Sequence, residues 1–215
     1  MILPLSPRPT CTSANPYRIN PPRIVDQVTT RHPESQATFV PHSPGDIHNL
    51  IMKVRPMTLD DLGGVHEIDV LSFSLPWPEK SFHFELTQNP STLALVGEIQ
   101  PDNAEPRLIG MSVIWIIIDE AHIATIAIHP DYRGRGYGKY LLAEVLHRSI
   151  ERGAQLATLE VRASNLLAQQ MYHRFGFSTV GRRLHYYRDN DEDAIVMTVK
   201  NLGPKYLARL NIFDR

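Results

Sequence analysis

Hydrophobic and polar residues follow a regular order only beyond residue 50 of this 215-residue chain. Before that point neither helical nor strand periodicity is visible, and residues 1–50 contain more than half of the 17 prolines. We therefore predict a disordered, proline-rich tail over residues 1–50. A folded domain is expected over residues 51–200, followed by a C-terminal extension over residues 201–215 whose pattern predicts nothing.

Within the domain, runs of apolar and β-branched residues bounded by turn residues predict seven strands. They are expected at Ile51–Arg55, Thr92–Ile99, Leu108–Ile118, Ala121–His129, Leu156–Arg162, near Phe177–Tyr187, and Ala194–Lys200. Helical spacing and end signals predict four helices. One opens at Thr58, one runs from just after Pro78 to near Asn89, and the others are Gly138–Arg152, capped by Gly153, and Ser164–Phe175, closed by Gly176.

Composition excludes several classes of protein. No apolar run approaches the roughly 20 residues that span a membrane, and a formal net charge of -1 gives no general field for nucleic acid. The single cysteine, Cys11, excludes an intrachain disulfide and a cysteine zinc site. Prolines at positions 4, 7 and 9 interrupt the start, which argues against a secretory signal. We predict a cytoplasmic protein; a transit peptide and a start of translation at Met52 are the alternatives left open.

The most specific motif is a glycine-rich turn between the strand that ends near Ile128 and the following helix. It consists of Arg133, Gly134, Arg135, Gly136, Tyr137 and Gly138, and Lys139 follows it. Glycines allow a sharp turn and a close approach of backbone N–H groups, and the helix N-terminus adds partial positive charge. This combination suits a pyrophosphate. Glycine spacing alone fits a plain helix-entry loop equally well, and the preceding antiparallel strands argue against a dinucleotide fold.

The turn resembles the acetyl-CoA motif of the GNAT superfamily of N-acetyltransferases. The resemblance covers residues 52–200 and narrows to the RimI family of ribosomal-protein-alanine N-acetyltransferases. It is carried by Leu75–Lys80, Ile126–Tyr132 and above all Leu159–Asn165, and further along by Tyr172, Gly176-Phe177, Tyr186-Tyr187 and Asp193-Ala194. The implied fold is of the α/β (α+β) class. Its central, mostly antiparallel sheet is flanked by helices and splays at the cofactor site between the strands ending at His129 and starting at Leu156.

The resemblance also implies roles for individual residues. Glu160 matches the general base and Tyr172 the general acid. The residues that match cofactor contacts are Ile126, Ala127 and Ile128, which pair with the pantetheine arm, the glycine turn with Lys139, and Asn165. Trp77, Tyr186 and Tyr187 are expected beside the acceptor peptide. A modest base suffices for an N-terminus, because an α-amine with a pKa of about 7.7–8.0 is partly neutral at pH 7, whereas lysine at about 10.4 is not.

Each of these assignments has a plainer alternative. Strand alternation by itself favours a solvent-facing Glu160, and Tyr172 on its helix favours core packing with a satisfied hydroxyl. Trp77, between two prolines, fits a loop anchor in the core as well as a wall of the peptide site. Tyr186 and Tyr187 also fit ordinary strand aromatics.

Two further features bear on the acceptor and on metals. The acidic run Asp189, Asp191, Glu192 and Asp193 is expected in the last hairpin. Its plain interpretation is a solvated loop, and its functional one is attraction of a basic N-terminal segment. The histidines are scattered without metal-ligand spacing, so we predict no metal site.

The resemblance implies transfer of acetyl from acetyl-CoA, as co-substrate, to the N-terminal α-amine of a protein. The expected partner is the N-terminal alanine of a small-subunit ribosomal protein, without direct binding of nucleic acid or membrane. Three alternatives stay open: a broader Nα-acetyltransferase, an acetyltransferase of small-molecule amines, and a non-catalytic acetyl-CoA-binding module. The presence of both Glu160 and Tyr172 argues against the last.

Overall fold

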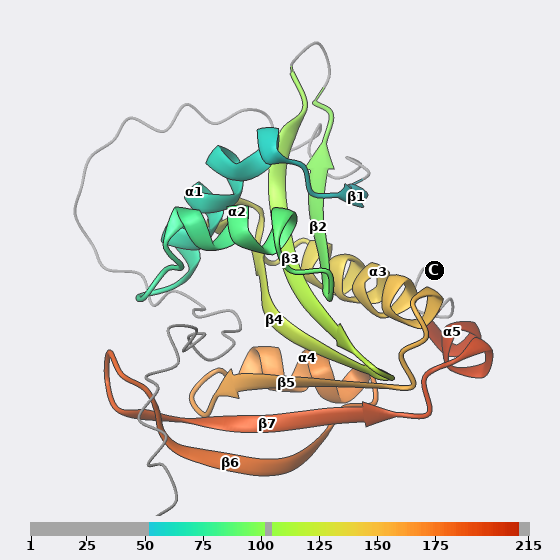
Figure 1. The fold of residues 1–215 in the computed structure, drawn as a ribbon. Helices are drawn as coiled ribbons and strands as arrows, with labels where there is room; N and C mark the ends of the chain where they lie inside the picture. Colours follow the sequence, from blue (N-terminus) through green and yellow to red (C-terminus); the bar gives the residue numbers. More distant parts are fainter. Residues whose placement is uncertain (1–51, 102–104, 211–215) are drawn as a thin grey trace, which may run out of the picture.

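A computed structural model describes residues 52–101 and 105–210 of the chain. The predicted disordered tail, residues 1–50, lies outside the described residues. Seven strands form one sheet in the order β1-β2-β3-β4-β5-β7-β6 (Figure 1). The strands are β1 Lys53–Pro56, β2 Thr92–Ile99, β3 Arg107–Ile117, β4 Glu120–Ile128, β5 Leu156–Arg162, β6 Ser178–Tyr187 and β7 Glu192–Lys200. Every neighbouring pair is antiparallel except β4 and β5, so the predicted mixed, mostly antiparallel sheet is confirmed.

The helices agree with the predicted ones to within about two residues at most ends. The four that were predicted are α1 Leu62–Ser72, α2 Glu79–Thr87, α3 Tyr137–Glu151 and α4 Leu166–Arg174, and a fifth, α5 Pro204–Leu210, was not predicted. The predicted start at Thr58 is a 3-10 turn, Leu59–Asp61, that leads into α1. There the Asp61 carboxylate accepts from the Thr58 N–H at 2.7 Å, which satisfies a donor at the helix start. Gly153 and Gly176 follow α3 and α4 with φ of 92° and 84°, as their capping roles require.

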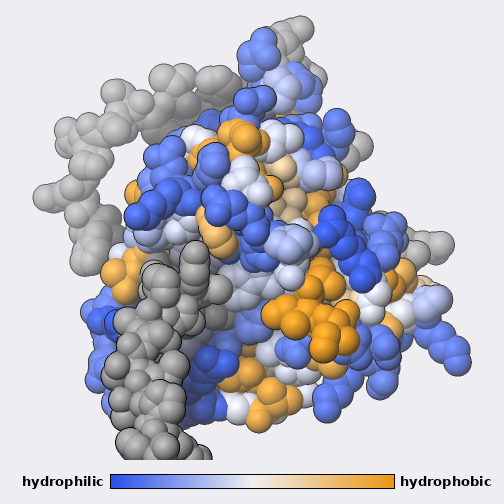
Figure 2. Space-filling view, viewed as in Figure 1, coloured by the Kyte–Doolittle hydropathy of each residue, from blue (hydrophilic) through white to orange (hydrophobic). Residues whose placement is uncertain are grey.

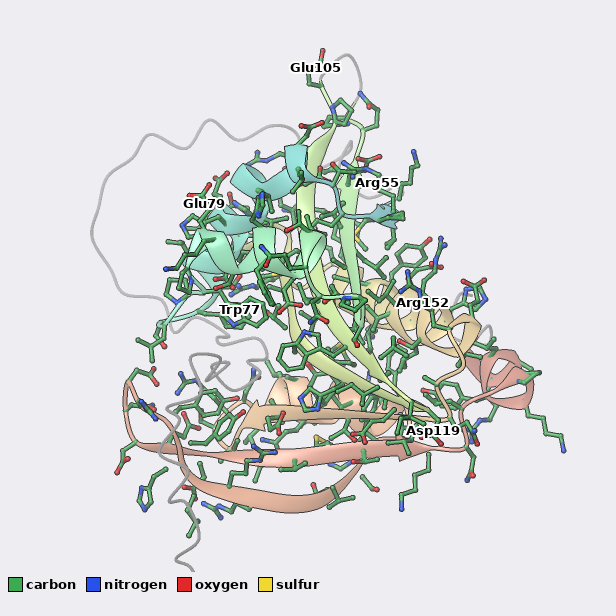
Figure 3. All side chains as sticks on the ribbon, viewed as in Figure 1. Arg55, Trp77, Glu79, Glu105, Asp119 and Arg152 are labelled. Atoms are coloured by element: carbon green, nitrogen blue, oxygen red, sulfur yellow. The ribbon has the colours of Figure 1, made fainter. Side chains whose placement is uncertain are left out.

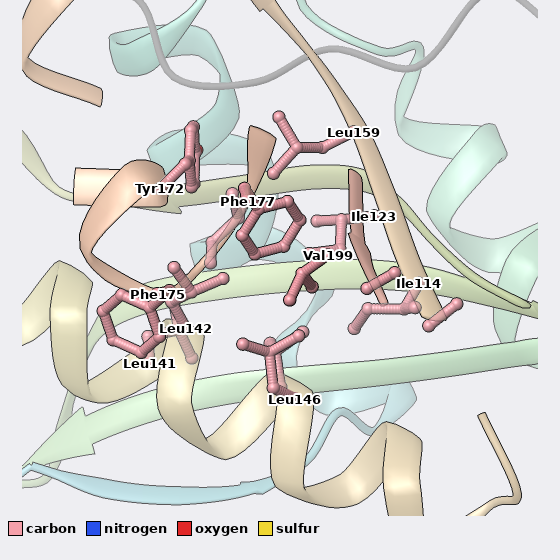
Figure 4. Packing of buried hydrophobic residues seen from close by; sticks show 14 of the residues in the cluster. Ile114, Ile123, Leu141, Leu142, Leu146, Leu159, Tyr172, Phe175, Phe177 and Val199 are labelled. Carbon is pink, nitrogen blue, oxygen red and sulfur yellow. The ribbon is translucent and has the colours of Figure 1, made fainter. Parts of the chain in front are cut away.

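The sheet separates two hydrophobic cores. On one face α1 and α2 bury Val65, Ile68 and Phe82 against β2, β3 and β4. On the other face α3, α4 and α5 pack over the larger core. Figure 4 shows part of this core, with Leu141 and Leu142 of α3 near Phe175 and Tyr172 of α4 near Phe177. The apolar stripe of α3 contributes Leu141, Leu142, Val145 and Leu146, all fully buried. Burial of each such side chain contributes about 1.5–3 kcal/mol, which makes this face the main anchor of α3.

The parallel pair β4–β5 is short and opens into a fork. Pairing joins Glu120, Ala121 and His122 to Leu156, Ala157 and Thr158, and extends no further. Just beyond this point β4 carries an extra residue, because Val113 pairs with Thr125 and Ile114 with Ile123. Such a bulge bends its strand and increases its twist. The bulge therefore contributes to turning β4 away from β5, and the predicted splay lies between these two strands (Figure 1).

The folded region continues past residue 200. Helix α5 returns to the larger core, where Leu202 and Tyr206 are buried. The Tyr206 hydroxyl donates to the Phe175 carbonyl at 2.7 Å, just after α4. The first half of the predicted C-terminal extension is thus a packed part of the domain.

No helix in the described ranges is long and apolar enough to cross a membrane. In the same ranges no group of three or more His, Cys, Asp or Glu side chains is placed to hold a metal ion.

An apolar patch is visible near the end of β3 in Figure 2, where the β3–β4 turn exposes Ile117 and Ile118.

Candidate active site

The glycine turn lies at the N-terminus of α3, as predicted. Gly134 and Gly136 have φ of 77° and 90°, a region that side chains rarely adopt, and no atom lies within 4 Å of where their Cβ atoms would be. Gly138 is different, because its φ is not in this region and a Cβ there would make ordinary contacts with Ile128 and Met171. In the first turn of α3 the N–H groups of Lys139 and Tyr140 donate to the Gly136 carbonyl at 3.0 and 3.2 Å, whereas the N–H groups of Tyr137 and Gly138 lie ahead of the regular helical hydrogen bonds. Two glycines therefore shape an open turn at the start of α3, and its binding of a pyrophosphate stays a prediction.

The basic residues in and directly after the turn have different surroundings. Arg133 points back into the fold, with Nε donating to the Ile128 carbonyl at 2.8 Å and Nη2 to the Ser72 hydroxyl at 2.8 Å. It ties the turn to the ends of β4 and α1. Arg135 lies with Arg107 over the ring of Tyr132, 5.3 and 5.5 Å from its centroid. Lys139 is exposed beside them.

The three strand residues expected to pair with a ligand lie beyond the fork. Ile126, Ala127 and Ile128 are buried and pair with β3 through Ser112, Met111 and Gly110. No residue of β5 pairs with them, since the β4–β5 ladder ends at His122. The β5-facing edge of this stretch is therefore an open sheet edge that leads to the glycine turn.

Glu160 lies on β5, two residues past the last β4–β5 pair. Its side chain is 0% exposed, so the solvent-facing position favoured by strand alternation is wrong. Its two oxygens face two basic side chains, with His122 Nε2 3.2 Å from Oε2 and Arg183 Nη2 2.9 Å from Oε1. Neither contact has the alignment of a hydrogen bond. Among the described residues the carboxylate therefore lies beside two basic groups without an aligned hydrogen bond, and its role as general base stays a prediction.

Tyr172, on α4, is fully buried and packs against Phe177 with ring centroids 5.7 Å apart. Its hydroxyl has no hydrogen-bond partner among the described residues, which differs from the satisfied hydroxyl of a plain core tyrosine. Burial raises the pKa of this hydroxyl well above its ordinary value, so it stays protonated at neutral pH. An orphaned buried donor calls for an explanation, and a ligand atom is one.

Asn165 begins α4. Its Oδ1 accepts from the Ala168 N–H at 3.2 Å, so the carboxamide caps the helix. Its predicted cofactor contact is not tested by this geometry and stays a prediction.

From Glu160 one row of rings leads to the α1–α2 loop. His122 stacks on Trp115 at 5.7 Å, and Trp115 stacks on Trp77 at 6.4 Å. Trp77 is buried in the smaller core below α2, where its backbone N–H donates to Asp69 Oδ2 at 2.6 Å (Figure 3). This is the position of a loop anchor; a role as wall of the acceptor site stays a prediction.

A second row leads from Glu160 to the two predicted tyrosines. The Arg183 guanidinium lies 5.4 Å from the ring centroid of Tyr186, which meets Tyr187 edge-on at 5.2 Å. Tyr187 in turn lies 4.0 Å from the Arg162 guanidinium. The structure therefore connects Glu160 through side-chain contacts with all three predicted acceptor residues.

Arg162 joins three segments around this second row. Its guanidinium contacts Asp189 at 2.7 Å and Glu192 at 3.2 Å, both in the β6–β7 hairpin. It also donates to the hydroxyl of Ser74, in the loop after α1, at 3.2 Å. Glu192 Oε1 accepts from the N–H of Ser164 at 2.6 Å.

Basic side chains lie beside each member of the acidic run. Besides the two carboxylates on Arg162, Asp193 pairs with Arg182 at 2.6 Å and Asp191 lies 2.9 Å from His185. Three of the four carboxylates therefore pair with arginines of β5 and β6, whereas Asp191 is 76% exposed, and attraction of a basic N-terminal segment stays a prediction.

The matching family model, described as the acetyltransferase (GNAT) family, spans residues 62–177, from α1 through the glycine turn and Glu160 to α4. The chain belongs to the GNAT acetyltransferases. This GNAT protein is 43% identical over 146 residues to a Bacillus subtilis (strain 168) protein provisionally named ribosomal protein bS18-alanine N-acetyltransferase. The match covers 68% of this chain and 93% of that one.

A further relative and a solved structure identify the family more closely. The Escherichia coli (strain K12) ribosomal protein bS18-alanine N-acetyltransferase is 31% identical over 157 residues, covering 68% of this chain and 95% of its own. The crystal structure of the Escherichia coli ribosomal-protein-S18-alanine N-acetyltransferase superimposes with a TM-score of 0.63 at 28% identity, over 72% of this chain and 96% of that chain. The expected membership in the RimI family is confirmed, and the chain is an N-acetyltransferase enzyme.

Proposed function

We propose that this GNAT enzyme acetylates the N-terminal alanine of ribosomal protein bS18 in the cytoplasm. One observation carries the proposal: a fully buried carboxylate, Glu160, lies where β4 and β5 separate, between an open strand edge and the residues expected at the acceptor. The names of the relatives, at 31% and 43% identity, support this acceptor.

The residues present fit acetyl-CoA. The open edge at Ile126–Ile128 offers backbone partners for the amides of the pantetheine arm, and the turn with φ-positive Gly134 and Gly136 leaves room for the pyrophosphate. Arg135 and Lys139 add positive charge at that end. Bound acetyl-CoA supplies a reactive thioester carbonyl and a thiolate leaving group.

Glu160 acts as the general base. An α-amine with a pKa of about 7.7–8.0 is already partly neutral at pH 7, so the carboxylate has only to take one N–H proton as the nitrogen attacks. Backbone N–H groups near Ile128 would face the carbonyl oxygen as negative charge develops on it.

Tyr172 acts at the leaving group. Its buried hydroxyl is protonated, the state that a general acid needs. Because a thiol has a pKa of about 8.5, below that of this tyrosine, complete proton transfer to the sulfur is uphill. The hydroxyl therefore acts mainly as a hydrogen-bond donor that stabilises the departing thiolate.

The acceptor is tested with peptides that differ only in their first residue. Purified enzyme is given acetyl-CoA and a bS18 N-terminal peptide beginning with Ala, Ser or Met, and acetylated product is measured by mass spectrometry. We expect kcat/KM for the Ala peptide to exceed the others by at least about tenfold, a difference of about 1.4 kcal/mol in transition-state binding. Comparable turnover on all three contradicts the narrow specificity and supports a broader Nα-acetyltransferase.

The same acceptor is checked in cells. Comparison of protein N-termini with and without the gene should show loss of acetyl from bS18 alone. Turnover of a free polyamine with none of the peptides modified contradicts an N-terminal acceptor altogether.

A further inference from the structure

His122 occupies the point at which the two strands of the fork part. It is the last residue of β4 that pairs with β5, opposite Thr158, and it follows directly on the buried Ala121. Its Nε2 is buried and lies 3.2 Å from Glu160 Oε2, whereas the side chain as a whole is 18% exposed. The ring thus connects a carboxylate without solvent contact to a partly accessible surface.

Neighbours from several elements fix the ring. Trp115 of β3 stacks on it, and the Trp115 Nε1–H donates to the buried carboxylate of Glu85 on α2 at 3.0 Å. The hydroxyls of Thr158, on β5, and Thr198, on β7, lie 3.0 Å apart, and Thr158 is the residue that pairs with His122. The ionisable groups around His122 are therefore Glu160 in contact, Arg183 across Glu160, and Glu85 behind Trp115.

A fully buried base must pass on the proton it takes before the next turnover. Of the two basic side chains that face Glu160, Arg183 cannot accept a proton because arginine is always charged. Histidine changes its charge near neutral pH and can accept one. Of the two side chains that contact Glu160, His122 is therefore the one that can accept a proton and pass it to solvent.

We propose that His122 is a positioning residue that acts through Glu160, holding the carboxylate and relaying its proton to solvent; this rests on Glu160 being the base of the proposed function. The amine proton moves to Glu160 Oε2, and from there to the lone pair of His122 Nε2, which makes an imidazolium. The imidazolium releases one proton to water, so the carboxylate and the neutral ring are both restored.

The test compares His122→Ala and His122→Gln with wild type and with His147→Gln. His147 is a half-exposed histidine on α3, near Glu151 and away from the fork, and it serves as matched control. We expect kcat of both His122 variants to fall by roughly 10- to 100-fold with little change in KM for acetyl-CoA. In wild type and His147→Gln, kcat should rise between pH 6 and 8. Both His122 variants should lose part of this rise. Unchanged kcat overturns the proposal.

Imidazole distinguishes proton relay from a structural defect. Added imidazole should restore kcat of His122→Ala in a concentration-dependent way, and should not affect Glu160→Gln or wild type. A loss of kcat in His122→Ala without rescue, at unchanged melting temperature, overturns the relay. If His122→Ala does not fold, the lost pH dependence in His122→Gln decides alone.

A measurement independent of the acceptor separates this inference from the proposed function. The ring ¹⁵N resonances of His122, followed by NMR against pH, should respond to Glu160→Gln and not to His147→Gln. An identical titration curve in Glu160→Gln and wild type overturns the coupling. If instead wild type fails to acetylate the bS18 peptide while this response is present, the acceptor is wrong and the coupling stands.

Discussion

Glu160 and Tyr172 are equally buried, yet their polar atoms have different surroundings. The carboxylate faces two basic groups, and the hydroxyl faces no partner among the described residues. A core carboxylate without a role would cost stability to bury. Both side chains therefore make physical sense as parts of a site that a substrate completes.

Removing either group should lower turnover more than binding. We expect Glu160→Gln and Tyr172→Phe each to reduce kcat by roughly 10- to 1000-fold, because each removes a proton-transfer or hydrogen-bonding function used in the transition state. Steady-state kinetics measures kcat, and calorimetry measures the Kd for coenzyme A, which should change only slightly. Unaltered turnover in both variants would exclude this mechanism.

Among the elements, strands and helices were predictable because their patterns are local. The alternation and apolar runs give every strand to within about two residues. The Ala124 bulge was not predictable, because it is defined by the register of β4 against β3. Helix α5 is seven residues long, and only its packing on the larger core reveals its role.

Some residues of the candidate site could be predicted from the sequence and others could not. The resemblance named Glu160 and Tyr172, but the sequence gives no signal for His122, a lone histidine within an apolar strand. Its relation to Glu160 exists only once β4 and β5 lie side by side. The contact of Arg133 with the interior could not be predicted for the same reason, since its partner Ser72 lies 61 residues earlier in the chain.

Among the contacts that join separate elements, those of Arg162 should contribute most to stability. Arg162→Met leaves Asp189 and Glu192, with side chains only 19% and 15% exposed, without their cation. Breaking a buried pair in this way costs about 3–5 kcal/mol, less where water reaches the carboxylates. Urea unfolding should show a clear drop in stability, and KM for the peptide should rise as the hairpin and the α1–α2 loop separate.

Arg182→Met is the control for this experiment. Its side chain is 59% exposed on its pair with Asp193, so we expect a change of about 0–1 kcal/mol. Equal destabilisation by the two variants would mean that Arg162 is an ordinary surface charge.

For the whole molecule, paired carboxylates set the response to acid. The hydrogen bond from Arg55 is the main cause that lowers the pKa of Asp61 below its ordinary 3.8. In Asp189 and Glu192 burial raises the pKa, but hydrogen bonds lower it by more, so both pKa values lie below their ordinary values. For Asp189 these bonds come from Ser74 and then Arg162, and for Glu192 from Ser164, then Asn190 and Arg162. The unfolded chain therefore binds more protons than the native one near pH 4, and stability falls as pH falls.

These groups should leave the stability unchanged between pH 7 and 6 and reduce it progressively below about pH 4.5. The urea midpoint measured from pH 7 to pH 3 checks this, with Asp61→Asn expected to show a smaller loss. A midpoint that stays constant down to pH 3 would contradict the shifts.

The fork between β4 and β5 has a consequence for folding as well as for catalysis. A protein with a central sheet normally seals every interior edge, because an unpaired row of N–H and C=O groups invites pairing with foreign strands. Here the sheet keeps such an edge beside the buried carboxylate of Glu160. In the proposed function the coenzyme arm acts as a temporary strand, so the enzyme's own substrate also protects it from aggregation.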